Sequence, residues 1–194
     1  MRNALLNDRT GILYMKVGTH AQEPLDAIIA RKAKEIEDEG FALWGYGGNT
    51  CHPSTMVQPF GRIFEKRGGR ILLCMQEMNS SHFAEQVRAD AYSVDGITWQ
   101  DIPSGINVLG SRYALKIRDL RKVDEVLPLD RTIVAVGNSQ GRQGSRYIQG
   151  RVDKACLELS PDAEATDEDD ERTVGINLVA EIEQPYAFFL KNRT

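Results

Sequence analysis

The residues best suited to binding an anion follow a predicted strand at residues 132–136. Glycine lets backbone amides approach an anion closely, and the forked donors of arginine suit phosphate. The sequence therefore predicts a phosphate-binding loop made of Gly137, Asn138, Ser139, Gly141, Arg142, Gly144, Ser145 and Arg146, with Arg151 nearby. The loop contains neither a Walker pattern nor a G-x-G-x-x-G fingerprint, so an ordinary glycine-rich turn with solvated arginines is the competing interpretation.

A second glycine-rich loop follows the predicted strand at residues 41–46. It offers Trp44 and Tyr46 for stacking on a planar ring, bare backbone at Gly47 and Gly48, and Asn49 as a hydrogen-bonding side chain. These residues favour recognition of a base or another ring. The competing interpretation is that both aromatic residues belong to the core and that the glycines only turn the chain.

Groups that could transfer protons also follow strands. His20, His52 and His82 come after the first, second and third predicted strands, and Glu77 lies at the end of the third. If these strands are parallel, all four side chains lie at one sheet edge, where open α/β sheets bind ligands. Histidine and glutamate there are candidates for acid and base catalysis or for ligand binding. We expect the three histidines to converge with Trp44 or Tyr46 on one crevice.

The cysteines do not indicate a metal site or a disulfide framework. Cys51, Cys74 and Cys156 are odd in number and widely spaced, and the histidines lack the spacing of metal ligands. Cys51 is poorly placed to act as a nucleophile with His52 as its general base, because adjacent residues of an extended segment point to opposite faces. We therefore expect no metal and no cofactor, and a reducing, cytoplasmic location.

The elements that position these residues alternate in the first half of the chain. Strand patterns at residues 11–17, 41–46 and 71–75 alternate with helical patterns that begin at Pro24 and Pro59, and a third helix would be capped within residues 79–81. This order predicts an α/β fold with a parallel βαβαβα N-terminal half. We expect one domain over residues 1–194.

The second half of the chain predicts antiparallel pairing, so the sheet should be mixed. Asp95 and Gly96 stand between two short strand patterns as in a hairpin turn, and further strands are predicted at residues 113–117, 132–136 and 174–182. Residues 145–159 fit either a helix or a strand from residue 152 to 159. The acidic stretch at residues 160–172 is interpreted as a solvated surface loop.

Composition narrows the functional classes. The chain has 194 residues, and its formal charge of -4 disfavours duplex nucleic acid as the main partner. No apolar stretch is long enough to span a bilayer, so we expect no membrane partner. Self-association into a homo-oligomer stays open.

Three functions remain. The first is a binding protein for a small phosphorylated or nucleotide-like molecule, such as a signalling nucleotide, with phosphate on the Gly137 loop and a ring on the Trp44 loop. The second is a hydrolase or lyase that acts on such a molecule through the histidines or Glu77. The third is a protein-interaction domain without a small-molecule site.

Overall fold

The computed structural model describes residues 4–81, 83–150, 152–162 and 171–193, and the strands in these ranges form one mixed sheet. The strands are β1 (Thr10–Thr19), β2 (Ala42–Tyr46), β3 (Arg70–Ser81), β4 (Ala91–Ser93), β5 (Gln100–Asp101), β6 (Tyr113–Pro128), β7 (Thr132–Val134), β8 (Lys154–Leu159) and β9 (Thr173–Lys191). The helices are α1 (Leu25–Glu39), α2 (Gln58–Lys66) and the four-residue α3 (Gly144–Tyr147). A π-helical turn, η1 (Pro53–Val57), leads into α2, and a 3-10 turn, η2 (Leu129–Arg131), precedes β7.

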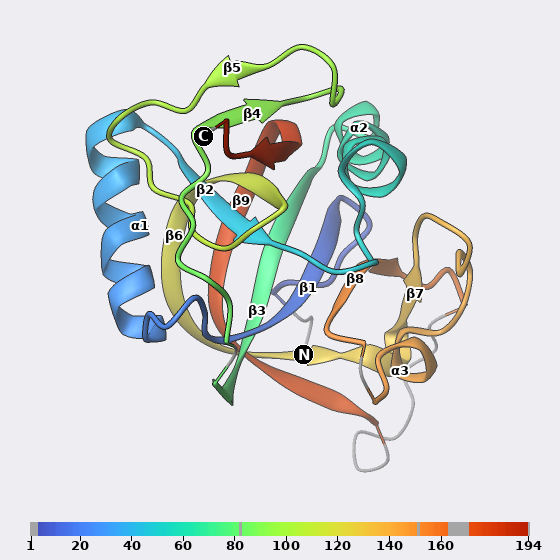
Figure 1. Cartoon of the computed structure of the whole chain (residues 1–194). Coiled ribbons are helices and arrows are strands. Elements are labelled where there is room, and N and C mark those ends of the chain that lie inside the picture. Colours follow the sequence, from blue (N-terminus) through green and yellow to red (C-terminus); the bar gives the residue numbers. More distant parts are fainter. Residues whose placement is uncertain (1–3, 82, 151, 163–170, 194) are drawn as a thin grey trace.

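The mixed sheet agrees with the prediction, but the parallel N-terminal half does not. The strand order is β2-β6-β9-β3-β1-β8-β7, with β4 and β5 attached beside β9 (Figure 1). β1 and β3 pair in parallel, whereas β2 pairs with β6 in antiparallel orientation. The order of elements along a chain does not decide which strands become neighbours. Here β6 and β9, with 16 and 19 residues, separate β2 from β3.

The third predicted helix is also wrong. Residues 79–81 do not cap a helix, because β3 continues through them and pairs with β1 as far as Thr19 and Ser81. Residues 83–87 contain no helix. The ladder to β1 therefore outweighs the local capping preference of Asn79 and the serines that follow it.

The second half of the chain follows the predicted pairing more closely. β4 and β5 form an antiparallel pair around Asp95 and Gly96, although the connection spans residues 94–99 and is longer than a two-residue turn. The strand alternative is correct for β8, which pairs with β1 and β7. Residues 163–170 of the acidic stretch lie outside the described residues, and Glu171 forms an ion pair with Arg131 at 2.6 Å.

The described residues form three apolar cores, of which two lie on opposite faces of β1 and β3. Leu13 and Leu73 face a core that includes Ile28 of α1 and Phe60 of α2, whereas their neighbours Ile12 and Leu72 face a second core. The alternation of side chains along a strand produces this arrangement. Strands β1 and β3 are consequently buried on both sides.

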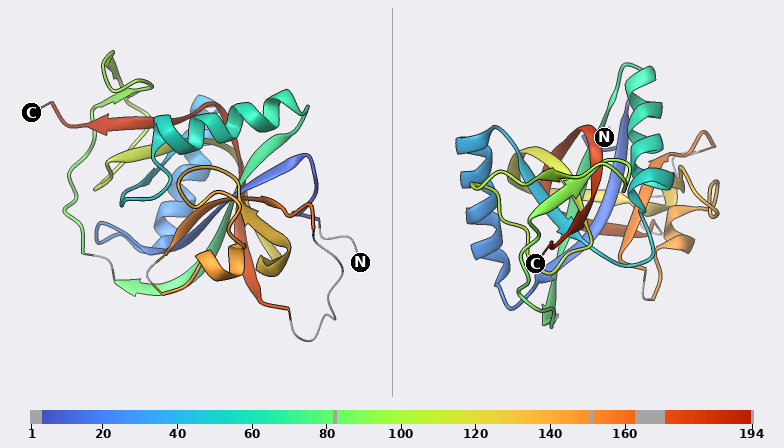
Figure 2. Two further views of the ribbon diagram at one scale, coloured as in Figure 1. Left: turned by 90° about the vertical axis from the view of Figure 1, so that its right-hand side faces the viewer. Right: turned by 45° about the horizontal axis from the view of Figure 1, so that its top comes forward.

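The helices cover separate parts of the first face. α1 packs against β2 and β6, while α2 lies over β1, β3 and β9 (Figures 1 and 2). β6 and β9 pair along four stretches separated by three register shifts, and Figure 1 shows β6 curving strongly. Bulges of this kind bend a sheet. Among the described helices, none has the length and apolarity needed to cross a bilayer.

Candidate functional site

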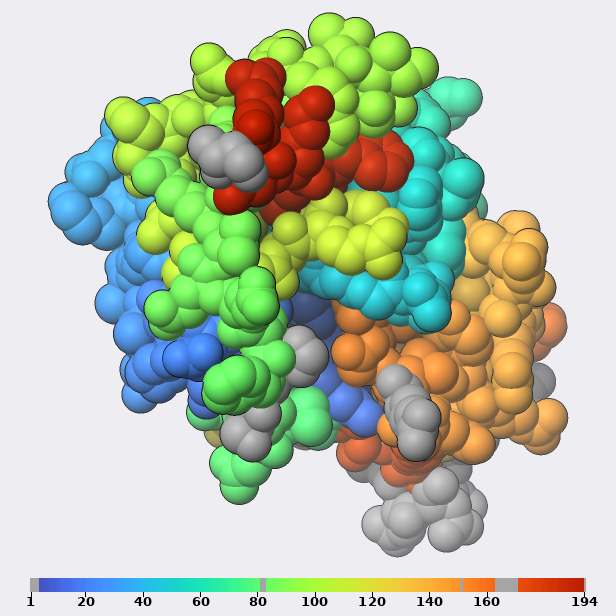
Figure 3. Space-filling view, in the orientation of Figure 1, coloured from blue at the N-terminus to red at the C-terminus, as the bar shows by residue number. Residues whose placement is uncertain are grey.

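A cavity of about 760 Å³ opens where β1 and β2 end and β8 begins. Its lining comes from β1 and α1, from the loop after β2, from residues 107–111 before β6, and from residues 150–154. Figure 3 shows the hollow, with the dark blue of β1 deep between the green and orange segments. We call it the glycine-loop cavity, after the loop of residues 47–50 that follows β2. Its volume lies in the range of small-molecule sites.

The glycine loop leaves its backbone donors unused. The amides of Gly47, Gly48, Asn49 and Thr50 form no hydrogen bond with another described residue, and all four residues line the cavity. Gly48 has φ +90°, which a side chain would strain. Consecutive backbone amides left free at a concave surface are suited to binding an anion.

A buried ammonium group lies beside this loop. The side chain of Lys154 is 8% exposed, and its Nζ lies 3.4 Å from the position that a Cβ at Gly48 would occupy. Its ion-pair partner is Asp153, at 2.9 Å, whose side chain is 52% exposed. The position follows from β8, where Lys154 pairs with Met15 and faces the same side as Cys156. The cavity therefore contains a cation whose counter-charge is largely solvated.

The two aromatic residues that precede the loop belong to the first core and also line the cavity. Trp44 and Tyr46 are 5% and 4% exposed and pack in the first core, yet both line the cavity. The hydroxyl of Tyr46 donates to the carbonyl oxygen of Cys51 at 2.6 Å, and burial raises the pKa of Tyr46, so it stays a neutral phenol. The indole nitrogen of Trp44 has no hydrogen-bond partner among the described residues.

The opposite wall is held by charged residues of α1. Lys32 and Glu35 lie on the buried face of the helix and form an ion pair at 3.0 Å. Arg31 binds both carboxylate oxygens of Glu23, at 3.1 and 2.6 Å. Burial lowers the pKa of Lys32 to about 8, against the attraction of Glu35. The basic charges of this wall are thus paired with carboxylates.

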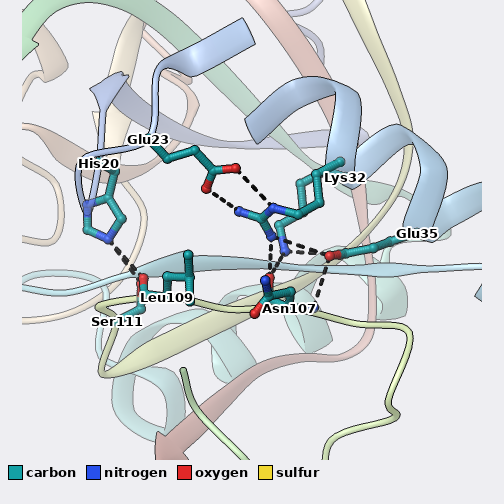
Figure 4. Close-up of polar contacts among 8 residues, drawn as sticks. His20, Glu23, Lys32, Glu35, Asn107, Leu109 and Ser111 are labelled. Atoms are coloured by element: carbon teal, nitrogen blue, oxygen red, sulfur yellow. Dashed lines mark hydrogen bonds and ion pairs between the residues drawn. The ribbon is translucent and has the colours of Figure 1, made fainter. Parts of the chain in front are cut away.

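This charged cluster fixes the backbone of Asn107 (Figure 4). The carbonyl oxygen of Asn107 accepts hydrogen bonds from Arg31 and from Lys32 Nζ, the latter at 2.6 Å. Its amide donates to Glu35 Oε1 at 2.9 Å. Asn107 lines the cavity, and its side-chain Oδ1 is a buried acceptor without a hydrogen-bond partner among the described residues.

His20 lines the same cavity near Ser111. Its Nε2 lies 3.1 Å from the carbonyl oxygen of Leu109 and 3.4 Å from Ser111 Oγ, which also donates to Leu109. Gly45 makes room for this arrangement, since a Cβ there would collide with Ser111. His20 and Ser111 together hold the carbonyl group of Leu109.

The predicted convergence of the histidines is not what the structure shows. His52 does not line the glycine-loop cavity, because the chain turns at Cys51, with φ +57°, and enters η1. Its ring instead packs against Tyr113 and Phe189, with centroid separations of 5.6 and 5.2 Å. His82 lies outside the described residues.

The remaining candidate groups lie away from the cavity. Glu77 is exposed on β3, where its amide donates to Asn177, and it is not part of the cavity wall. Cys51 and Cys156 are buried with their sulfur atoms 3.8 Å apart. The hydrogen bond with Cys51 and burial raise the pKa of Cys156, so its thiol stays protonated.

The Gly137 loop lies between β7 and α3 and does not line the cavity. The amides of Gln140, Gly141 and Arg142 donate to carbonyl groups of residues 134–139. Gly137 and Gly141 have φ of +87° and +84°, as tight turns require. Arg142 and Arg146 are exposed, and Arg151 lies outside the described residues. Asn138, Ser139, Gly144 and Ser145 belong to the same loop and the start of α3, and they also do not line the cavity.

Sequence reasoning missed Lys32, Glu35, Asn107 and Lys154. A signal existed for the first two, because they lie four and seven residues after Ile28, on the buried face of an amphipathic helix. Lys154 lies two residues before Cys156 in β8, so the two side chains share the inward face of the strand. Asn107 lies in an irregular segment, where no periodicity identifies it.

Groups of three or more potential metal ligands do not occur among the described residues. The chain matches no known family model, no curated protein and no solved structure.

Proposed function

We propose that the protein binds a small phosphate-bearing or nucleotide-like ligand in the glycine-loop cavity. The observation that carries this proposal is the buried ammonium of Lys154 beside four unpaired backbone amides at residues 47–50. Hydrogen bonds to a charged group contribute about 1.5–3 kcal/mol each, which favours an anion at this position. In this proposal the anion binds at the glycine loop after β2 and not at the Gly137 loop.

The other cavity residues support a ligand with a ring. Trp44 offers an apolar ring and an unpaired N–H donor in the same wall as the glycine loop. Aromatic walls with a few polar groups are typical of sites that bind planar ligands. The residues that the sequence offered as ring contacts, Trp44, Tyr46 and Asn49, line this cavity.

Binding without turnover is favoured by how the titratable groups are used. His20 contacts the carbonyl oxygen of Leu109, Glu23 binds Arg31, and Lys32 is paired with Glu35. Each of these groups already interacts with a protein atom, and a general acid or base must reach the ligand. Mass spectrometry of recovered ligand tests this part, because a chemically altered ligand would indicate an enzyme.

The test of the anion site is the substitution Lys154→Met. We expect the affinity for pyrophosphate and for ribose 5-phosphate, measured by calorimetry, to fall at least tenfold, since one charged hydrogen bond is lost. Lys34→Met is the matched control, because Lys34 is an exposed lysine of α1, paired with Asp38 at the surface. It should bind like the parent.

The Gly137 loop is tested in the same titrations. Arg142→Ala and Arg146→Ala should leave the affinity unchanged if the anion binds in the cavity. A loss in these variants together with an unchanged affinity in Lys154→Met would reverse the assignment. Failure of the parent protein to bind either probe or any nucleoside monophosphate would overturn the proposed function.

A further inference from the structure

Among the described residues, one buried polar side-chain atom has no hydrogen-bond partner, and it belongs to a residue that lines the cavity. Asn107 Oδ1 is a buried acceptor without a hydrogen-bond partner among the described residues. Buried polar groups almost always have partners, and an unsatisfied one destabilises the folded protein. A ligand that donates a hydrogen bond to this oxygen would explain why the protein provides no donor of its own.

The position of this side chain is fixed by its own backbone. Three side chains of α1, those of Arg31, Lys32 and Glu35, bind the carbonyl and amide groups of Asn107. The flanking residues Ile106 and Val108 are buried. These contacts hold the backbone of Asn107 in place, so its side chain starts from a fixed point in the cavity wall. A pre-organised polar group of this kind is a specificity element in binding sites.

The charges around Asn107 exclude an ionic partner for it. The two cations that bind the carbonyl oxygen of Asn107, Arg31 and Lys32, are paired with Glu23 and Glu35 and are thus already compensated. The ammonium of Lys154 lies instead beside Gly48. The two ends of the cavity thus differ, with an anion site at the glycine loop and a neutral hydrogen-bonding site at Asn107.

We propose that Asn107 recognises the hydrogen-bonding edge of a nucleobase, with Oδ1 accepting a ring or amino N–H and Nδ2 donating to the adjacent acceptor. An asparagine amide presents this pair of groups side by side, and it pairs with base edges in the same way in nucleic-acid recognition. This inference rests on the proposed function, since the phosphate at the glycine loop holds the ligand in the cavity. It names the ligand class as a nucleotide.

The test compares nucleotides with a ligand that lacks only the base. The parent protein should bind at least one of the 5′-monophosphates of adenosine, guanosine, cytidine and uridine more tightly than ribose 5-phosphate. Asn107→Leu keeps a similar side-chain size but removes both polar groups. We expect it to reduce this preference roughly tenfold and to leave the affinity for ribose 5-phosphate unchanged.

Asn79→Leu is the matched control. Asn79 is an exposed asparagine of β3 outside the glycine-loop cavity, so the same chemical change there should leave the preference for the base intact. The melting temperature of the ligand-free protein gives a second readout. Asn107→Leu should keep or raise it, because the unsatisfied acceptor is gone. A lowered melting temperature with unchanged nucleotide preference would mean that Asn107 is structural and would overturn the inference.

The two proposals fail in different ways. If no nucleotide binds more tightly than ribose 5-phosphate, the role of Asn107 is overturned, while Lys154-dependent binding of ribose 5-phosphate and pyrophosphate would still support the anion site. If Lys154→Met binds every probe like the parent, the anion site itself is wrong.

Discussion

Lys32 lines the cavity, and its charge is buried together with that of its ion-pair partner Glu35. Their side chains are 3% and 4% exposed, and such a pair rarely stabilises a fold as much as apolar side chains of the same size would. The pair instead determines where residues 106–108 lie, because both side chains bind the backbone of Asn107. Stability is thereby given up for a fixed cavity wall.

The pKa of Lys32 predicts how stability depends on pH. In the unfolded chain this lysine keeps its proton up to about 10.5, whereas burial lowers its pKa in the folded protein to about 8. Between these values unfolding takes up a proton, so the contribution of Lys32 to stability rises with pH, by at most about 1.4 kcal/mol per pH unit. Urea unfolding of the parent and of Lys32→Met at pH 7, 8, 9 and 10 measures it.

The comparison with the variant isolates this lysine from other titrating groups. We expect the stability of the parent, relative to Lys32→Met, to increase above pH 8 and to be constant below it. A difference between the two proteins that does not change with pH would show that Lys32 titrates normally.

At the scale of elements, the helices that could be predicted are those with a start or stop residue in the sequence, such as proline or glycine. α1 follows Pro24 and ends at Gly40, whose φ of +83° is the left-handed conformation expected of a helix C-cap. The third helix failed because β1 continues to Thr19 and provides β3 with a pairing partner. Which strands pair depends on distant residues, so local patterns could not predict the place of β2.

The part of the candidate site that lies in one continuous loop could be predicted, and the part built from distant residues could not. The loop at residues 44–49 was found by composition and does line the cavity. The Gly137 loop has a similar composition, but its amides are used in its own turns. Composition shows that glycines permit an anion site and cannot show whether the amides are free. Asn107 and Lys154 lie far from the loop along the chain, and only the fold brings them to the same cavity.

Gly69 joins α2 to β3 where no side chain fits. A Cβ there would collide with the carbonyl oxygen of Arg9, which accepts the hydrogen bond from the amide of Arg70 at 2.9 Å. Gly69→Ala should therefore lower the free energy of unfolding by about 1–3 kcal/mol. Urea denaturation measures the change.

Gly175→Ala serves as the comparison. Gly175 is exposed in β9, and a Cβ there would meet nothing within 4 Å. This variant should unfold within about 0.5 kcal/mol of the parent. Equal stability of the two variants would show that the start of β3 can shift to accept a side chain.

At the scale of the molecule, we expect the two cores that share β1 and β3 to open together. Cys74 of β3 and Cys156 of β8 flank β1 and are both fully buried, one in each core. Since either core loses its packing only when these strands separate, we expect both thiols to react with a maleimide at the same rate in mild denaturant.

Mass spectrometry of peptides from the labelled protein measures the two rates separately. Faster labelling of Cys156 than of Cys74 would show that the core on the cavity side opens alone. The cavity wall would then be the less stable part of the fold.

The position of β9 has a consequence for the synthesis of the protein. β9 separates β6 from β3 and also holds β4, so before residues 173–191 are made the strands can form only three unconnected parts, β2-β6, β4-β5 and β3-β1-β8-β7. Each part then has an open edge, and open edges pair with other chains. These edges stay open in the growing polypeptide until β9 has left the ribosome and pairs with them.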